Sequence, residues 1–96
     1  MEKKGKLTLS EGTIYEGELI NGKPHGRGKM TWIDGMVYVG GFIDGIANGK
    51  GKCTSPNGMV YQGNFANNTF NGKGKMTYPN GNIDEGNWKD GKFVGK

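Results

Sequence analysis

The sequence predicts an all-β protein: an elongated single-layer antiparallel sheet of tandem β-hairpins that repeat every 23 residues. Three observations predict this fold. Similar decapeptides recur with that step, as GRGKMTWIDG from Gly26, GKGKCTSPNG from Gly49 and GKGKMTYPNG from Gly72. The segments between the glycines alternate in side-chain character with period two, which is typical of strands. Asp-Gly and Asn-Gly pairs supply turns at regular intervals.

Composition limits the chain to one domain with little interior. Of its 96 residues, 20 are glycine and 32% are hydrophobic, which is little material for an enclosed core. The aromatic residues stand at regular positions, which favours an ordered repeat over disorder. A single cysteine excludes an internal disulfide, and the opening MEKKGKLTLS has no apolar leader, so we expect a cytoplasmic location.

Alignment in steps of 23 gives glycine columns without insertions. They are Gly5, Gly28, Gly51 and Gly74; Gly12, Gly35, Gly58 and Gly81; Gly17, Gly40, Gly63 and Gly86; and Gly26, Gly49, Gly72 and Gly95. A fifth column reads Gly22, Gly45, Asn68 and Gly91. Because Asn tolerates left-handed backbone best after Gly, this column predicts a turn with positive φ. The single array, 1–96, then divides into a half unit at 5–11, units at 12–34, 35–57 and 58–80, and a partial unit at 81–96.

Each unit is predicted to be a two-stranded hairpin, with one strand in Thr13–Leu19 and the next in Gly26–Trp32 of the first unit. The pairs Asp34-Gly35, Asn57-Gly58 and Asn80-Gly81 predict tight connections between units. The connection Ile20–Lys23 and its equivalents are predicted to be longer and polar. With about 4.8 Å between strands, the whole sheet should be roughly 40 Å long.

One face of the predicted sheet carries the large side chains together with paired glycines. Glycine leaves strand backbone bare, and a ring from a neighbouring strand restores apolar contact there. Since no second layer is predicted, one side of each ring should stay uncovered, and such a strip usually marks a binding surface. We expect a groove for a partner protein, most simply an amphipathic helix. The alternative is that the rings only cover glycines. The groove residues are Tyr15, Leu19, Met30, Trp32, Tyr38, Phe42, Tyr61, Phe65, Met76, Tyr78 and Trp88.

The opposite face carries lysines. Their partners in the same hairpin are acidic in the first unit, with Glu16 and Glu18, and uncharged in the middle units. The uncompensated cations form a basic patch of Lys50, Lys52, Lys73 and Lys75, able to attract anionic phospholipid at up to about 1 kcal/mol per charge. The alternative is a solvated face that keeps the sheet soluble. Because rings and lysines point to opposite faces, no nucleic-acid site is expected.

Catalytic and cofactor chemistry is not expected. His25 shares a column with Asn48, Asn71 and Val94, which is typical of an exposed loop rather than an acid/base group. Cys53 falls in a column of Leu and Met and is interpreted as a small apolar filler. One His and one Cys cannot form a zinc set. The strings GRGK and GKGK lack the Ser or Thr and the helix of a phosphate-binding loop.

Two stretches resemble the MORN repeat (membrane occupation and recognition nexus): YEGELINGKPHGRGKMTWIDG at Tyr15–Gly35 and YQGNFANNTFNGKGKMTYPNG at Tyr61–Gly81. The resemblance covers Gly5–Lys96. It implies an elongated sheet of hairpins and a role in assembling other proteins, often at the cytoskeleton, at cilia or at membranes. Asp84 in the tyrosine column and Ser55 in an aromatic column depart from the pattern, which predicts a weaker groove in the last unit and a shallower one near Ser55.

These observations predict a non-enzymatic scaffold that holds a partner protein in the aromatic groove, with a cytoskeletal or ciliary role implied by the resemblance alone. The alternative is a peripheral membrane adapter that uses the basic patch on anionic phospholipid. A regulatory subunit acting on a separate enzyme is a third class. The half unit at Lys6–Leu9 and the last residues, Phe93–Gly95, leave open sheet edges, so we expect a component of a larger assembly.

Overall fold

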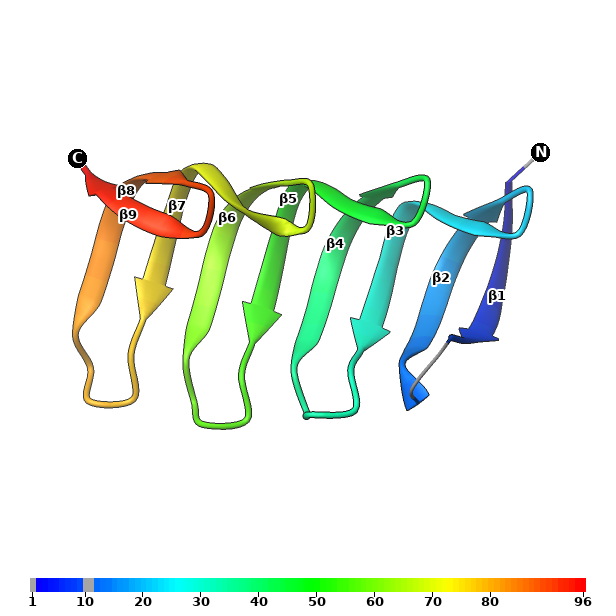
Figure 1. Cartoon of the computed structure of the whole chain (residues 1–96), viewed down its shortest axis with the longest axis horizontal. Coiled ribbons are helices and arrows are strands. Elements are labelled where there is room, and N and C mark those ends of the chain that lie inside the picture. Colours follow the sequence, from blue (N-terminus) through cyan, green and yellow to red (C-terminus); the bar gives the residue numbers. More distant parts are fainter. Residues whose placement is uncertain (1, 10–11) are drawn as a thin grey trace.

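The computed structural model describes residues 2–9 and 12–96, which form one open antiparallel sheet of nine strands in chain order (Figure 1). The strands are β1 (Glu2–Thr8), β2 (Ile14–Ile20), β3 (Lys23–Thr31), β4 (Val37–Ile43), β5 (Ile46–Thr54), β6 (Val60–Ala66), β7 (Thr69–Thr77), β8 (Ile83–Lys89) and β9 (Lys92–Gly95). The predicted all-β fold class is confirmed, and the longest dimension is 39 Å, close to the predicted length. Residues 10–11 of the half unit 5–11, and residue 1 of the array, lie outside the described residues.

A row of glycines crosses the sheet and is covered by tyrosine rings. Adjacent strands from β1 to β8 place glycine opposite glycine, at Gly5, Gly17, Gly28, Gly40, Gly51, Gly63, Gly74 and Gly86. A Cβ added at Gly51 would lie 2.5 Å from both Oη and Cε1 of Tyr38. The pairs of covered glycine and covering ring are Gly28 with Tyr15, Gly51 with Tyr38 and Gly74 with Tyr61. The predicted packing of rings on bare backbone is confirmed, because a larger residue does not fit beneath these rings.

A bulge beside the covered glycines bends the rest of each hairpin out of the regular ladder. The β2–β3 register changes from Gly17 opposite Gly28 to Leu19 opposite Pro24, so β3 has extra residues there. The β4–β5 and β6–β7 pairs have equivalent shifts. Bulges bend strands and interrupt ladder hydrogen bonds. A tyrosine hydroxyl donates to a carbonyl at each of these bulges: Tyr15 to Glu18 O at 2.6 Å, Tyr38 to Gly41 O at 2.8 Å and Tyr61 to Asn64 O at 2.9 Å.

The turns within hairpins are shorter than predicted, and the connections between units are longer. Two residues join the strands of each hairpin, and both have positive φ, as in a type I′ turn. These pairs are Asn21-Gly22, Asp44-Gly45, Asn67-Asn68 and Asp90-Gly91. The connection around Asp34-Gly35 spans residues 32–36, with Gly35 N donating to Trp32 O at 3.0 Å. The predicted turn lengths were therefore wrong, whereas the positive φ in the column of Gly22 is confirmed.

The bent hairpin ends, which we call the tips, are hydrogen-bonded to one another and cover the aromatic side chains. The contacts run from Gly45 N to Pro24 O at 2.8 Å, from Asn68 N to Ala47 O at 3.2 Å and from Gly91 N to Phe70 O at 3.0 Å. Figure 1 shows the tips along one end of the sheet, each crossing toward its neighbour. Tyr15, Tyr38 and Phe42 are consequently only 0%, 1% and 2% exposed. The expectation that one side of each ring stays uncovered is wrong for these residues, because the tips supply the missing cover.

We predict that Gly51→Ala destabilises the fold by about 2 kcal/mol, because the new methyl group would overlap the Tyr38 ring. The matched control is Gly5→Ala in the same glycine row, where the nearest atom is the flexible end of Leu19 at 3.1 Å. Its cost should be about 0.5 kcal/mol or less. Urea unfolding of both variants measures the difference. An equal loss of unfolding free energy in the two variants would show that the packing of the Tyr38 ring does not require a glycine beneath it.

Candidate functional site

The structure gathers the predicted groove residues into one cluster, but it leaves few of them accessible. Eight are buried: Tyr15, Met30, Tyr38, Phe42, Tyr61, Phe65, Met76 and Trp88. The other three, Leu19, Trp32 and Tyr78, are half-buried and pack against that core. The buried rings meet mostly edge to face, for example Tyr38 and Phe65 with centroids 4.6 Å apart. Any guest on this face therefore contacts the half-buried residues first.

Four of the half-buried apolar side chains lie where the long connections meet the sheet. We call Trp32, Met36, Met59 and Tyr78 the loop-side strip; all four are half-buried and pack against the core. Trp32 N donates to Met36 O at 2.9 Å, and Ser55 N donates to Met59 O at 2.8 Å, so successive units present this strip in the same way. Sequence reasoning missed Met36 and Met59, although both fall in one column of the 23-residue repeat.

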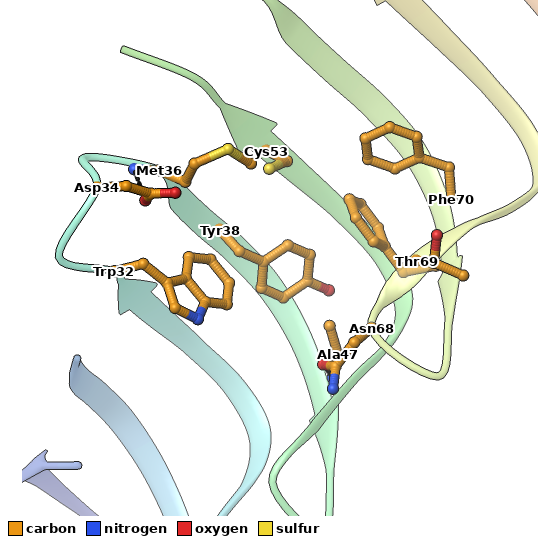
Figure 2. A pocket seen from close by; sticks show the side chains of 10 residues that line it. Trp32, Asp34, Met36, Tyr38, Ala47, Cys53, Asn68, Thr69 and Phe70 are labelled. Carbon is orange, nitrogen blue, oxygen red and sulfur yellow. Dashed lines mark hydrogen bonds between the residues drawn. The ribbon is translucent and has the colours of Figure 1, made fainter. Parts of the chain in front are cut away.

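An apolar pocket of about 310 Å³ lies between the loop-side strip and a tip (Figure 2). Its lining residues are Trp32, Asp34, Met36, Tyr38, Ala47, Cys53, Phe65, Asn68, Thr69 and Phe70. Two small side chains make room for it. Ala47 shares a column with Phe70 and Phe93, and Cys53 shares one with Met30 and Met76. Sequence reasoning did not include Ala47, because an alanine gives no signal unless its own column is compared.

Cys53 is buried, at 7% exposed, which confirms the prediction of a small apolar filler. Burial raises the pKa of its thiol, and the nearby Asp34 carboxylate raises that pKa further. The thiol therefore stays protonated at neutral pH and is a poor nucleophile or metal ligand.

Burial also controls the tyrosine hydroxyls. It raises the pKa of Tyr38 to about 12, although the positive charge of Arg27 acts in the opposite direction. In the last unit Asp84 replaces the ring of the tyrosine column and accepts a hydrogen bond from the Tyr78 hydroxyl at 2.8 Å. That bond raises the pKa of Tyr78. Both phenols are neutral at physiological pH.

The polar face has a shallow hollow of about 750 Å³ lined by cations. We call Arg27, Lys50, Lys52 and Lys73 the basic hollow; Gly51 and Gly63 are also among its lining residues. Lys52 lies between two uncharged residues, Val39 and Gln62. Among the described residues, none of the four cations is within 4 Å of a carboxylate oxygen. The Glu18 carboxylate does accept a hydrogen bond from the backbone amide of Arg27 at 2.6 Å, so the uncompensated positive charge of the hollow rests on Lys50, Lys52 and Lys73.

Two expectations for polar residues need correction. Lys75 of the predicted basic patch is not uncompensated, because Glu85 of the next hairpin stands opposite it. Sequence reasoning considered only partners within one hairpin, and for the same reason it omitted Arg27 from the patch. His25 is not in an exposed loop: it belongs to β3, is 34% exposed, and its Nδ1 lies 3.8 Å from Asp44 Oδ1 of the next tip.

The geometry defines a class of protein first: an open array of β-hairpins with a covered aromatic face and a polar face. The MORN repeat matches residues 15–37, 38–60, 61–83 and 85–96, and the chain belongs to this family. MORN repeats are non-catalytic motifs that generally serve as scaffolds for interaction with proteins or membranes. No curated protein matches the chain. In the part that the structure describes, no helix is long and apolar enough to cross a membrane.

We predict that alkaline pH weakens the fold through Tyr38. Its folded pKa of about 12 exceeds the ordinary tyrosine value of 10.0, so the folded state favours the neutral phenol. This contribution to stability is fully present below pH 10 and is lost as pH rises toward 12. The free energy of unfolding should fall less over this range in Tyr38→Phe, which cannot ionise. An equal fall in wild type and variant would contradict the assignment. Ultraviolet titration of tyrosinate provides a second readout.

Proposed function

We propose that the chain is a non-enzymatic scaffold that binds a partner protein along its aromatic face. The observation that supports this best is the loop-side strip, which consists of four half-buried apolar side chains from successive units. Two of them, Trp32 and Met36, also line the apolar pocket. Units follow one another at roughly 10 Å, which is two strand spacings. Residues i and i+7 of a helix are about 10.5 Å apart, so an amphipathic helix lying across the strands presents one anchor to each unit.

The proposed setting is cytoplasmic, at the cytoskeleton or a cilium, and within a larger assembly. The cytoskeletal or ciliary part of this setting comes from the family resemblance alone. The assembly is supported by the outer edges of β1 and β9, which have no neighbouring strand among the described residues. Unpaired strand edges are able to pair with another chain. Sedimentation of the chain at micromolar concentration, alone and mixed with the captured partner, tests whether it is part of a larger assembly. A strictly monomeric chain in both samples would contradict this proposal.

We expect the double variant Trp32→Ser and Met59→Ser to reduce partner retention at least about tenfold, since central apolar anchors dominate interface energies. The matched control is Ile43→Ser with Ile83→Ser, two residues that are 48% and 50% exposed and lie outside the strip. Capture from native extract, compared by mass spectrometry at low and high salt, is the measurement. Retention that survives the first double variant, or disappears at high salt, contradicts groove binding.

Core positions are unsuitable for this test. Phe42 and Phe65 are 2% and 5% exposed, so Phe42→Ala or Phe65→Ala would remove buried packing worth about 3–5 kcal/mol and report on folding instead of binding.

A second candidate function is supported by the basic hollow. We propose, as the alternative, a peripheral membrane adapter that places this face on anionic phospholipid. The four cations lie on one face and are exposed, and among the described residues none of their side chains forms a salt bridge. Each Lys or Arg near an anionic bilayer contributes about 1 kcal/mol, and the attraction falls off within a Debye length.

Flotation with vesicles of phosphatidylserine and phosphatidylcholine tests the alternative. Lys52→Glu with Lys73→Glu should weaken binding by at least about 2 kcal/mol, and rising salt should abolish it. The control is Lys29→Glu with Lys75→Glu, which changes net charge equally but at positions that already face Glu16 and Glu85. Equal losses in both pairs would mean that net charge, and no defined site, attracts the vesicles.

A further inference from the structure

The chain itself shows where an aromatic ring belongs on a covering tyrosine. In the third hairpin the ring of Phe70 stacks on that of Tyr61, with centroids 4.0 Å apart and planes 18° from parallel. The same column places Ala47 one unit earlier, beside Tyr38. The backbone around both positions is equivalent, since Ala47 faces Phe42 across the strands and Phe70 faces Phe65. The second hairpin therefore lacks a ring that the third hairpin has.

The apolar pocket lies where that ring is lacking. Ala47 and Cys53 are both among its lining residues, and Figure 2 shows Tyr38 in its middle, between Trp32 on one side and Phe70 on the other. About 310 Å³ is enough space for one aromatic side chain. The aromatic residues that line the pocket suit an aromatic ligand, because aromatic rings prefer edge-to-face or offset-stacked contact with other rings.

Charge at the rim limits the guest further. Asp34 is the charged residue among those that line the pocket, and no Lys or Arg lines it in the described part of the chain. The charge at the pocket is therefore opposite in sign to that of the whole chain, which has a net charge of +4. One carboxylate oxygen, Oδ1, accepts a hydrogen bond from Met36 N at 3.0 Å, and Asp34 is exposed to solvent. A cation next to the guest ring would meet this carboxylate.

We propose that this pocket binds an aromatic side chain of a partner polypeptide that has Lys or Arg beside it. The inference rests on the proposed function, because the partner must lie on the aromatic face for its side chain to enter. The guest ring enters between the half-buried Trp32, Met36 and Phe70, above the buried Ala47, and its neighbouring cation pairs with Asp34. The unit at 35–57, whose sequence departs most from the repeat, thus becomes the one that selects the partner.

Two small probes isolate this chemistry. Tryptamine combines an indole ring with an ammonium group, and indole-3-propionate combines the same ring with a carboxylate. Titration of each into the ¹⁵N-labelled chain should give saturable shifts of the Ala47, Cys53 and Phe70 amides with tryptamine. A Kd in the millimolar range is expected for a ligand of this size. Indole-3-propionate should bind at least about threefold more weakly, as expected for one exposed charge pair.

Variants that copy the chain's own columns supply the control. Ala47→Phe and Cys53→Met introduce the residues found at Phe70 and Met76, and each should abolish tryptamine binding while the dispersed spectrum persists. Because each of these two variants fills the pocket independently, the test still works if one of them does not fold. Asp34→Asn retains an oxygen for the Met36 amide and should make the two probes bind equally. Asp44→Asn makes the same charge change in an exposed turn outside the pocket and should leave the preference for tryptamine unchanged.

The proposal is overturned if tryptamine gives no saturable shift of these amides, if both filling variants fold and still bind it, or if the preference survives Asp34→Asn. Partner retention by the loop-side strip is a separate measurement. Retention without tryptamine binding removes this inference and leaves the proposed function. Tryptamine binding without retention removes the proposed partner protein and leaves only the preference of the pocket for a cationic aromatic group.

Discussion

The structure depends on one contact, a tyrosine ring lying against bare glycine backbone. Tyr38 covers Gly51 so closely that a single methyl group would overlap it. The same ring directs its hydroxyl to a carbonyl at the bulge, at 2.8 Å, so one side chain both fills the gap above glycine and stabilises the bend beside it. The bend brings the tips over the rings, and the tips then complete a core that a flat single layer would lack. Since each ring also touches the next unit, the contact is propagated along the array.

A repeat of this kind separates stability from recognition. The columns that hold the fold together are filled by the same residue types in successive units, whereas the surfaces with room for another molecule are found where units differ. Ala47 and Cys53 leave the apolar pocket because their columns elsewhere carry larger groups. The basic hollow exists because Val39 and Gln62 flank Lys52, while glutamates stand beside Lys29 and Lys75. Both surfaces are thus local departures from a regular background.

Much of the fold could be predicted from the sequence, because period-two alternation and the 23-residue step are local signals. They located the strands, the glycine row, the left-handed turn at Gly22 and the burial of Cys53. The bulge was not predictable in this way, because it is a shift in register between strands and no single residue encodes it. Without the bulge there is no tip, so the rings were expected to be open and the turn lengths were reversed. Charge pairing between hairpins, as for Lys75 and Glu85, was missed because only partners within one hairpin were compared.

Proton NMR tests the central contact most directly, since a ring stacked on a glycine shifts the Hα resonances of that glycine strongly upfield. The structure predicts such shifts for Gly28, Gly51 and Gly74, which lie under tyrosine rings, and ordinary strand values for Gly5, which does not. Replacement of Tyr38 by Leu should return the Gly51 protons to ordinary values and leave those of Gly28 and Gly74 shifted. Ordinary values at all four glycines in the wild-type chain would contradict the account.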